Sequence, residues 1–152
     1  MSALCVDGLI HHCGILRILQ CRQDESTCQL FKILPVKLYG PKGAVTVYAL
    51  LDEGFSVSLL EDEVACSLGL RGQKSSITLQ WYDNMRKTET SRKVKVEISP
   101  TNVDTKYDIR NLHTVKELSL PVQSFDKSNY EYLKHLPIEV YQNKKPSMLI
   151  GL

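Results

Sequence analysis

The chain has 152 residues, the size of one ordinary domain, and is long enough to bury a continuous core. Its 19 Lys and Arg against 17 Asp and Glu give a net charge of +2, and scattered basic residues do not support nucleic-acid binding. No apolar stretch reaches the roughly 18 residues that a membrane span needs, and the N-terminus lacks the layout of a signal peptide. We therefore expect a soluble cytoplasmic protein that engages neither membrane nor nucleic acid.

The first 27 residues are rich in cysteine and histidine. Thiolates and imidazoles are the usual zinc ligands, but the spacing here matches neither Cys-x-x-Cys pairs nor a zinc knuckle. The odd cysteine count and a reducing compartment also argue against a disulfide framework. We expect residues 1–27 to be a poorly ordered connecting segment without metal, and a metal-binding protein is the alternative. The potential ligands are Cys5, His11, His12, Cys13, Cys21 and Cys28.

The next elements predict a hairpin followed by a helix. Residues 30–38 and 45–51 are apolar and β-branched, and turn residues join them at 39–43. After an abrupt stop, Ser58 to Glu61 has the form of a helix capping box. Gly69 is the expected end of that helix.

The second half of the chain predicts more strands and one further short helix. Residues 77–81 and 93–98 read as strands, with 82–92 as a polar hairpin tip. Ile109, Leu112 and Val115 indicate another strand. The remaining expectations are a capped helix from Ser128 to about Leu136, a strand at 138–141, a turn at 142–146 and an apolar run at 147–152. The predicted class is therefore all-β with two short helices.

Asp52 is the most informative candidate for a functional residue in the sequence. It stands in Leu50-Leu51-Asp52-Glu53-Gly54, where an apolar strand turns sharply. A carboxylate in such a place is costly unless it is paired, hydrogen-bonded or functional. Asp-x-Gly alone is also common in ordinary turns, where Gly allows a close approach of the backbone.

The flanking pattern resembles that of retroviral-type aspartic proteases. Apolar-apolar-Asp-x-Gly-x-Ser is followed by a short predicted helix and, much later, by apolar-apolar-Gly. From about residue 28 to the end, the order and spacing of the segments are similar to the aspartic peptidase domain of BEL/Pao-type retrotransposon polyproteins. The segments that carry the resemblance are 30–40, 48–54, 78–81 and 145–151.

This resemblance implies a closed, retropepsin-like β-barrel with Asp52 as the single catalytic aspartate of each chain. Two copies of Asp52 would face each other across a homodimer and share a proton, because two close carboxylates do not both ionise easily. One would act as general base on a water and the other would donate to the peptide carbonyl. The implied substrate is a peptide or polyprotein, and the implied chemistry requires no metal or cofactor.

The resemblance also implies supporting residues around Asp52. Glu53 stands where a hydroxyl residue usually locks the paired loops, and bulky Phe55 would overpack the dimer centre or line a substrate pocket. Residues 82–85 stand where such proteases carry, in sequence order, a flap that closes over the substrate. An ordinary exposed hairpin is the alternative. Trp81 is expected in the core. The full set is Glu53, Gly54, Ser56, Ile150 and Gly151 for the active-site loop, and Tyr82, Asp83, Asn84 and Met85 for the flap.

The C-terminal end leads to the alternative functional hypothesis. The sequence stops one residue after Gly151, so the retropepsin-like domain, residues 28–152, is expected to be truncated, mostly monomeric and a poor enzyme. Residues 14–19 are the best candidate for a compensating edge strand. The alternative function is an inactive or domesticated domain that keeps the fold and serves as a binding module. His113 and His135 are expected to be ordinary surface or capping residues.

Overall fold

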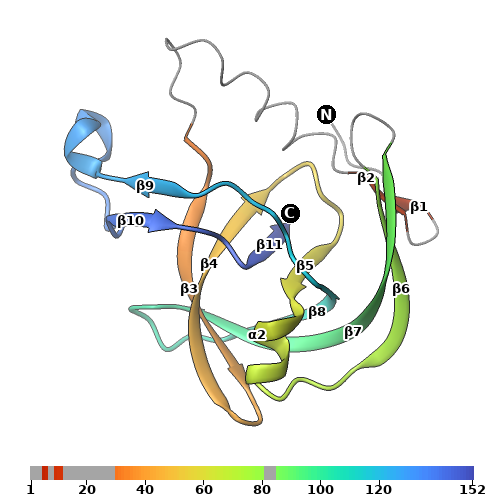
Figure 1. Cartoon of the computed structure of the whole chain (residues 1–152). Coiled ribbons are helices and arrows are strands. Elements are labelled where there is room, and N and C mark those ends of the chain that lie inside the picture. The colour runs from red at the N-terminus through yellow and green to blue at the C-terminus, as the bar shows by residue number, and fades with distance from the viewer. Residues whose placement is uncertain (1–4, 7–8, 12–29, 81–84) are drawn as a thin grey trace.

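The structure is a computed structural model that describes residues 5–6, 9–11, 30–80 and 85–152, and strands dominate it (Figure 1). About 55% of the chain is strand and 10% is helix, which confirms the predicted all-β class. Nine strands form one sheet in the order β1-β2-β6-β7-β3-β4-β11-β5-β8. Their bounds are β1 Cys5–Val6, β2 Leu9–His11, β3 Ile33–Gly40, β4 Gly43–Asp52, β5 Ser58–Glu61, β6 Gln73–Gln80, β7 Arg86–Pro100, β8 Tyr107–Val115 and β11 Met148–Gly151.

Six of these strands close into a barrel because β7 is long enough to pair with several neighbouring strands. Residues 97–100 of β7 pair with β3, and residues 93–98 pair with β8. The ring is completed through β4, β11 and β5. The first half of β7 leaves the barrel and forms a hairpin with β6, from Gln73↔Lys93 to Gln80↔Arg86.

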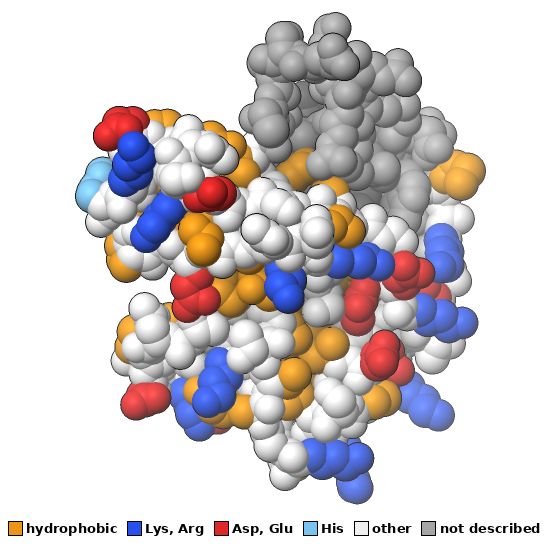
Figure 2. All heavy atoms as spheres, turned by 60° about the vertical axis from the view of Figure 1, so that its left-hand side comes forward, with side chains coloured by type: hydrophobic (Ala, Val, Ile, Leu, Met, Phe, Trp, Pro, Cys, Tyr) orange, Lys and Arg blue, Asp and Glu red, His pale blue; other side chains and the backbone are white. Residues whose placement is uncertain are grey.

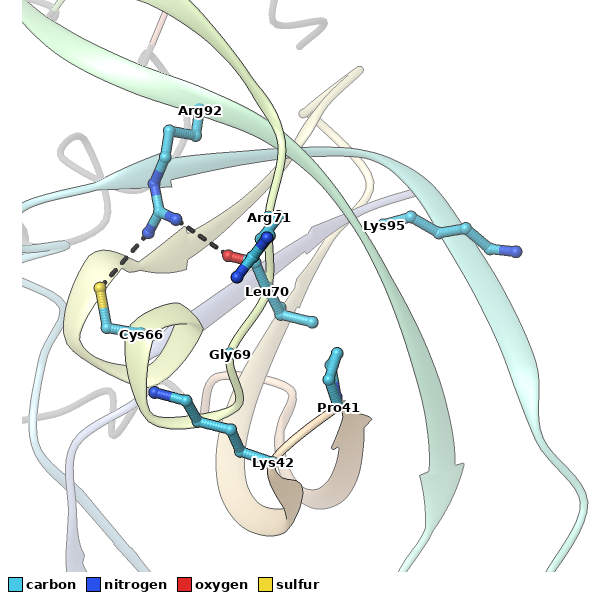
Figure 3. A pocket seen from close by; sticks show the side chains of 8 residues that line it. All are labelled: Pro41, Lys42, Cys66, Gly69, Leu70, Arg71, Arg92 and Lys95. Atoms are coloured by element: carbon cyan, nitrogen blue, oxygen red, sulfur yellow. Dashed lines mark hydrogen bonds between the residues drawn. The ribbon is translucent and has the colours of Figure 1, made fainter.

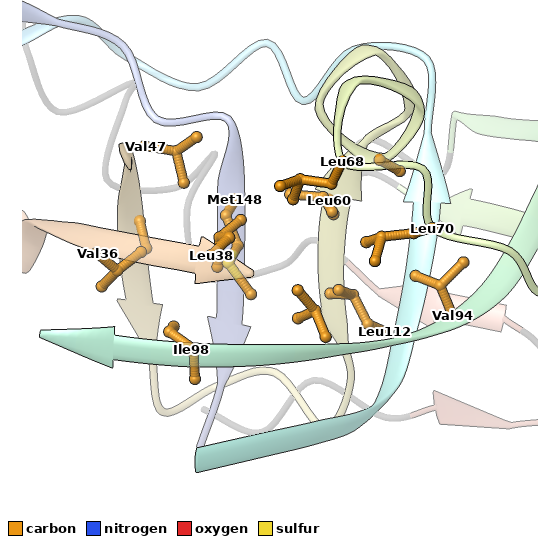
Figure 4. Close-up of a cluster of buried hydrophobic side chains, with 13 residues drawn as sticks. Val36, Leu38, Val47, Leu60, Leu68, Leu70, Val94, Ile98, Leu112 and Met148 are labelled. Atoms are coloured by element: carbon orange, nitrogen blue, oxygen red, sulfur yellow. The ribbon is translucent and has the colours of Figure 1, made fainter. Parts of the chain in front are cut away.

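Alternating side chains fill the barrel. Val94, Val96 and Ile98 of β7 are buried, whereas Lys95 and Glu97 between them are exposed, which confirms the strand predicted there. Figure 4 shows Val94 and Ile98 with side chains from the β3–β4 hairpin, from β11 and from Leu68, which follows the helix α2 (Asp62–Ser67). This first cluster includes Val36, Leu38, Val47, Ala49, Leu60, Ala65, Leu68, Leu70, Val94, Val96, Ile98, Leu112 and Met148.

A second buried cluster lies toward the end of β4 that carries Asp52. It joins residues from the barrel to residues from the smaller, two-stranded sheet of β9 (Gln123–Phe125) and β10 (Tyr141–Lys144). Because this cluster spans both sheets, they share one core. Its members are Ile33, Leu50, Phe55, Leu59, Ile77, Leu79, Val115, Leu118, Leu120, Phe125, Tyr141 and Leu149.

The hairpin prediction is confirmed, but the first helix is shorter than expected. Strands β3 and β4 pair through eight positions. The predicted capping box, Ser58 to Glu61, is wrong, because these residues form β5 and pair with β11 on one side and β8 on the other. Helix α2 begins only at Asp62, and its N-cap residue makes no side-chain hydrogen bond. Gly69 ends the helix as predicted, with a φ of +70°.

Three later boundaries also differ from the sequence-based expectation. Residues 86–92, expected in a polar hairpin tip, belong to β7, because their backbone pairs with β6. Glu89 and Ser91 are buried there, and the other side chains are exposed or partly buried. The helix expected from Ser128 is instead two 3-10 turns, η2 (Lys127–Asn129) and η3 (Glu131–Leu133), the first capped by Asp126. The strand expected at 138–141 and the turn at 142–146 are replaced by β10, which begins only at Tyr141.

The outer surface carries charges of both signs. Figure 2 shows Lys, Arg, Asp and Glu side chains interspersed over the face that includes the protruding η2 and η3 turns. No helix within the described part of the chain is long and apolar enough to cross a membrane. At the N-terminus, β2 runs parallel to β6 at residues 78–80, while residues 14–19 lie outside the described ranges.

Candidate active site

Asp52 is the last residue of β4, where two distant parts of the chain run side by side. Strand β11 pairs with β4 in parallel, with Leu149 opposite Leu50 and Gly151 opposite Asp52. Ile150 and Gly151, which the resemblance assigned to the active-site loop, therefore lie beside Leu51 and Asp52. Leu50 and Leu149 are buried, whereas Leu51 and Ile150 are only partly buried.

The backbone around Asp52 holds its carboxylate in place. The N–H of Gly54 donates to Oδ1 of Asp52 over 2.8 Å. The carbonyl oxygen of Asp52 accepts from the N–H of Leu152 at 3.2 Å and of Phe55 at 3.4 Å. The side chain is partly buried, and no second carboxylate among the described residues is hydrogen-bonded to it. Asp52 is thus positioned by backbone donors and open toward one side.

Gly151 is enclosed by the loop that follows Asp52. A Cβ atom at this position would lie 2.5 Å from the carbonyl oxygen of Phe55 and 2.6 Å from that of Val57. The N–H of Gly151 donates to Oγ of Ser58 at 3.3 Å. The sequence analysis gave Ser58 only a helix-capping role, whereas Ser56, which it assigned to the active-site loop, is exposed in a bend. The tie between loop and strand therefore comes from Ser58.

Replacing Gly151 with Ala should destabilise the protein by about 1–3 kcal/mol, the usual cost of overpacking. The added methyl group meets two backbone carbonyls, which cannot move without displacing the Asp52 loop. Urea denaturation measures the free energy of unfolding. Ser56→Ala in the same loop is the control and should change it by less than about 0.5 kcal/mol. Equal stability of Gly151→Ala and wild type would contradict the enclosure of residue 151.

Glu53 forms an ion pair with a residue of the segment that precedes β3. Its Oε1 lies 2.5 Å from Nζ of Lys32, and both side chains are largely exposed. The hydrogen bond from Lys32 and then its charge lower the pKa of Glu53, so the side chain is ionised. Lys32 also accepts the N–H of Leu51 through its carbonyl oxygen, at 2.9 Å. The residues just before β3 are therefore part of the site, which the sequence did not indicate.

Phe55 does not take the position that the sequence suggested. The expectation that it would crowd a dimer centre or line a substrate pocket is wrong, because its side chain is 1% exposed and belongs to the core of its own chain. The turn at Gly54 brings the chain back over the barrel end, so the next side chain points inward. Phe55 thereby anchors the loop that carries Asp52.

No protein-family model, curated protein or solved structure matches the chain. The site therefore has to be judged on its own geometry.

The predicted flap, residues 82–85, falls in the sequence between β6 and β7. Tyr82, Asp83 and Asn84 fall outside the described residues, as does Trp81. Met85 is described, and its side chain is 64% exposed. The two strands that lead to the tip pair without a register shift over eight positions, so they form a continuous arm.

The residues with metal-binding chemistry do not gather in the described part of the chain. Among the described side chains, no three His, Cys, Asp or Glu lie together. The cysteine and histidine cluster of the N-terminal segment is outside the described side chains. Cys66, at the end of α2, is exposed and carries a free thiol.

His113 is partly buried inside a strand, so it is not a capping residue. It lies within β8, opposite Lys93 on one neighbouring strand and Leu59 on the other. Its Nδ1 atom is buried and has no hydrogen-bond partner among the described residues. Burial, and then the charge of Lys93, lower the pKa of His113 below its ordinary value.

Folding stability should therefore fall as the pH drops below about 6.5, the ordinary histidine pKa. In this range the unfolded chain binds a proton at His113 more readily than the folded chain, so acid favours unfolding. His113→Gln should flatten this part of the pH profile of the unfolding free energy, measured by urea denaturation. The exposed His135→Gln is the control and should keep the wild-type slope. Parallel profiles for wild type and His113→Gln would contradict the assignment.

Proposed function

We propose that the chain is one subunit of a homodimeric, retropepsin-like aspartic endopeptidase that processes a retrotransposon polyprotein. The observation that supports this most is the pairing of Gly151 with Asp52. An Asp-x-Gly loop wrapped around an apolar-apolar-Gly strand, at the end of a closed barrel, is the arrangement that the resemblance implied. The two segments lie about a hundred residues apart in sequence.

The chemistry requires two carboxylates, and each chain supplies one. Asp52 is held by the Gly54 N–H, and its side chain is only partly buried, so a second copy could approach it. Two carboxylates in contact share one proton, which leaves one ionised and one protonated. The ionised Asp52 takes a proton from water as the water attacks the peptide carbonyl carbon, and the protonated partner donates to the carbonyl oxygen.

The barrel supplies the rigidity that this chemistry needs. Catalytic groups work best when packing fixes them on regular elements, and Asp52 ends a strand paired on both sides. The β6–β7 arm would cover a bound peptide and exclude water. An extended peptide would lie between this arm and the paired Asp52 loops.

A cleavage assay on the polyprotein that flanks this domain tests the proposal directly. Mass spectrometry of the products should show new termini from hydrolysis of specific peptide bonds. Absence of cleavage, with a monomer at high concentration, would favour the alternative of a non-catalytic binding module. In that case the chain would keep its fold but would lack the pair of catalytic aspartates, because a single chain supplies only one Asp52.

A further inference from the structure

A hollow lies at the end of β4 opposite to Asp52. Its volume is about 770 Å³, within the range of small-ligand sites. The walls come from the turn between β3 and β4, from the segment that ends α2, and from β7. Because β4 has ten residues at about 3.3 Å each, this hollow and Asp52 are separated by roughly 30 Å.

The lining of this hollow is strongly basic. Lys42, Arg71, Arg92 and Lys95 line it, and no acidic residue does. In the whole chain, by contrast, 19 basic residues face 17 acidic ones. Figure 3 shows these four side chains together with Leu70 and the other lining residues.

Two of the four positive charges are neutralised by nearby acids. Arg92 donates to Oδ1 of Asp62 at 2.6 Å, and Lys95 lies 3.1 Å from Oδ2 of Asp108. Figure 3 shows Lys95 extending away from the other three. Lys42 and Arg71 have no acidic partner among the described residues, so the hollow carries about two uncompensated charges.

The surroundings hold this basic wall in place. Arg92 also donates to the carbonyl oxygen of Leu70 at 2.9 Å and to Sγ of Cys66 at 3.4 Å. The stem of Lys42 packs over Gly69, where a Cβ atom would lie 2.8 Å from Cγ of Lys42. The backbone N–H of Lys42 donates to the carbonyl oxygen of Leu68 at 3.1 Å. Hydrogen bonds therefore hold Arg92, and packing holds the stem of Lys42, in the wall of the hollow.

We propose that this hollow binds a small, doubly or more highly charged oxyanion of the phosphate type, held by Lys42 and Arg71. A guanidinium offers paired N–H donors that match phosphate oxygens, and the ammonium adds a compact charge. A divalent anion balances the two charges that the fold leaves uncompensated. Cys66 lies beside the bound anion, which covers its thiol. The site is independent of the proposed peptidase function.

Titration of the full chain with inorganic pyrophosphate, at constant ionic strength adjusted with sodium chloride, tests this site. Calorimetry should show saturable binding. Bound pyrophosphate should slow alkylation of Cys66 by neutral iodoacetamide, followed residue by residue with mass spectrometry, because Cys66 lines the hollow. The other cysteines serve as internal references.

The double variant Lys42→Gln with Arg71→Gln should bind at least tenfold more weakly and lose the protection of Cys66. The matched control is Lys116→Gln with Lys144→Gln, which removes the same charge from exposed residues elsewhere and should bind like wild type. Equal weakening of both variants, or binding that does not saturate, would overturn the proposal. A double variant of Lys42 and Arg71 that unfolds more easily but binds pyrophosphate normally would also overturn it. In that case the role of Lys42 would be to compensate the negative charge at the carbonyl end of α2.

Discussion

Replacing Asp52 with Asn is expected to abolish peptide cleavage while leaving the fold intact. The amide of Asn keeps an oxygen that can accept the Gly54 N–H, so the loop retains its backbone tie. It cannot ionise, however, and therefore cannot take a proton from the attacking water. General acid-base groups contribute about 10²–10⁴-fold to rate, so cleavage should fall by at least about 100-fold.

The rate of cleavage of the flanking polyprotein and the free energy of unfolding should be measured on the same preparations. The unfolding free energy should be unchanged or slightly higher, because Asn removes repulsion between paired carboxylates. Asp104→Asn, at an exposed acid remote from the loop, is the control and should cleave like wild type. Cleavage at the wild-type rate by the Asp52→Asn variant would rule out an aspartic mechanism in this chain.

Replacing Leu149 with Ala should cost about 2–5 kcal/mol of folding free energy, the usual range for a buried leucine. Leu149 is fully buried in the second core cluster, and its strand is hydrogen-bonded to β4 on one side and β5 on the other. The substitution leaves a cavity directly under the Asp52 loop. Peptidase activity should therefore fall as well, as the loop loses its support.

Leu152→Ala is the matched control for this substitution. Leu152 is 65% exposed and contributes its backbone N–H to Asp52, which Ala retains. The free energy of unfolding should change by less than about 0.5 kcal/mol. A similar small change for Leu149→Ala, measured by urea denaturation, would contradict the burial of Leu149 between β4 and β5.

Local sequence patterns predicted those elements whose structure depends mainly on residues close to them in the sequence. The β3–β4 hairpin combines two β-branched runs with turn residues, and its pairing is decided within twenty residues. The alternation in β7 was equally clear. Gly69 was predictable because only a residue that tolerates positive φ ends a helix in this way.

Elements whose structure depends on pairing with distant parts of the chain could not be predicted from local patterns. Ser58 to Glu61 fits a capping box, but pairing with β11, about 90 residues away, and with β8 outweighs that local preference. For the same reason, Ser58 as the acceptor for Gly151 and Lys32 as the partner of Glu53 became visible only in three dimensions. The juxtaposition of Asp52 and Gly151 followed from the resemblance, and local propensity alone gave no sign of it.

Cleavage and association, measured on the same samples over a concentration series, test the central claim most directly. Sedimentation gives the fraction of chains in dimers, and a peptide from the flanking polyprotein gives the rate of cleavage per chain. If catalysis requires Asp52 from two chains, the rate per chain rises in proportion to the dimer fraction. An unchanging rate per chain in samples that sediment as monomers would contradict the homodimeric aspartic dyad.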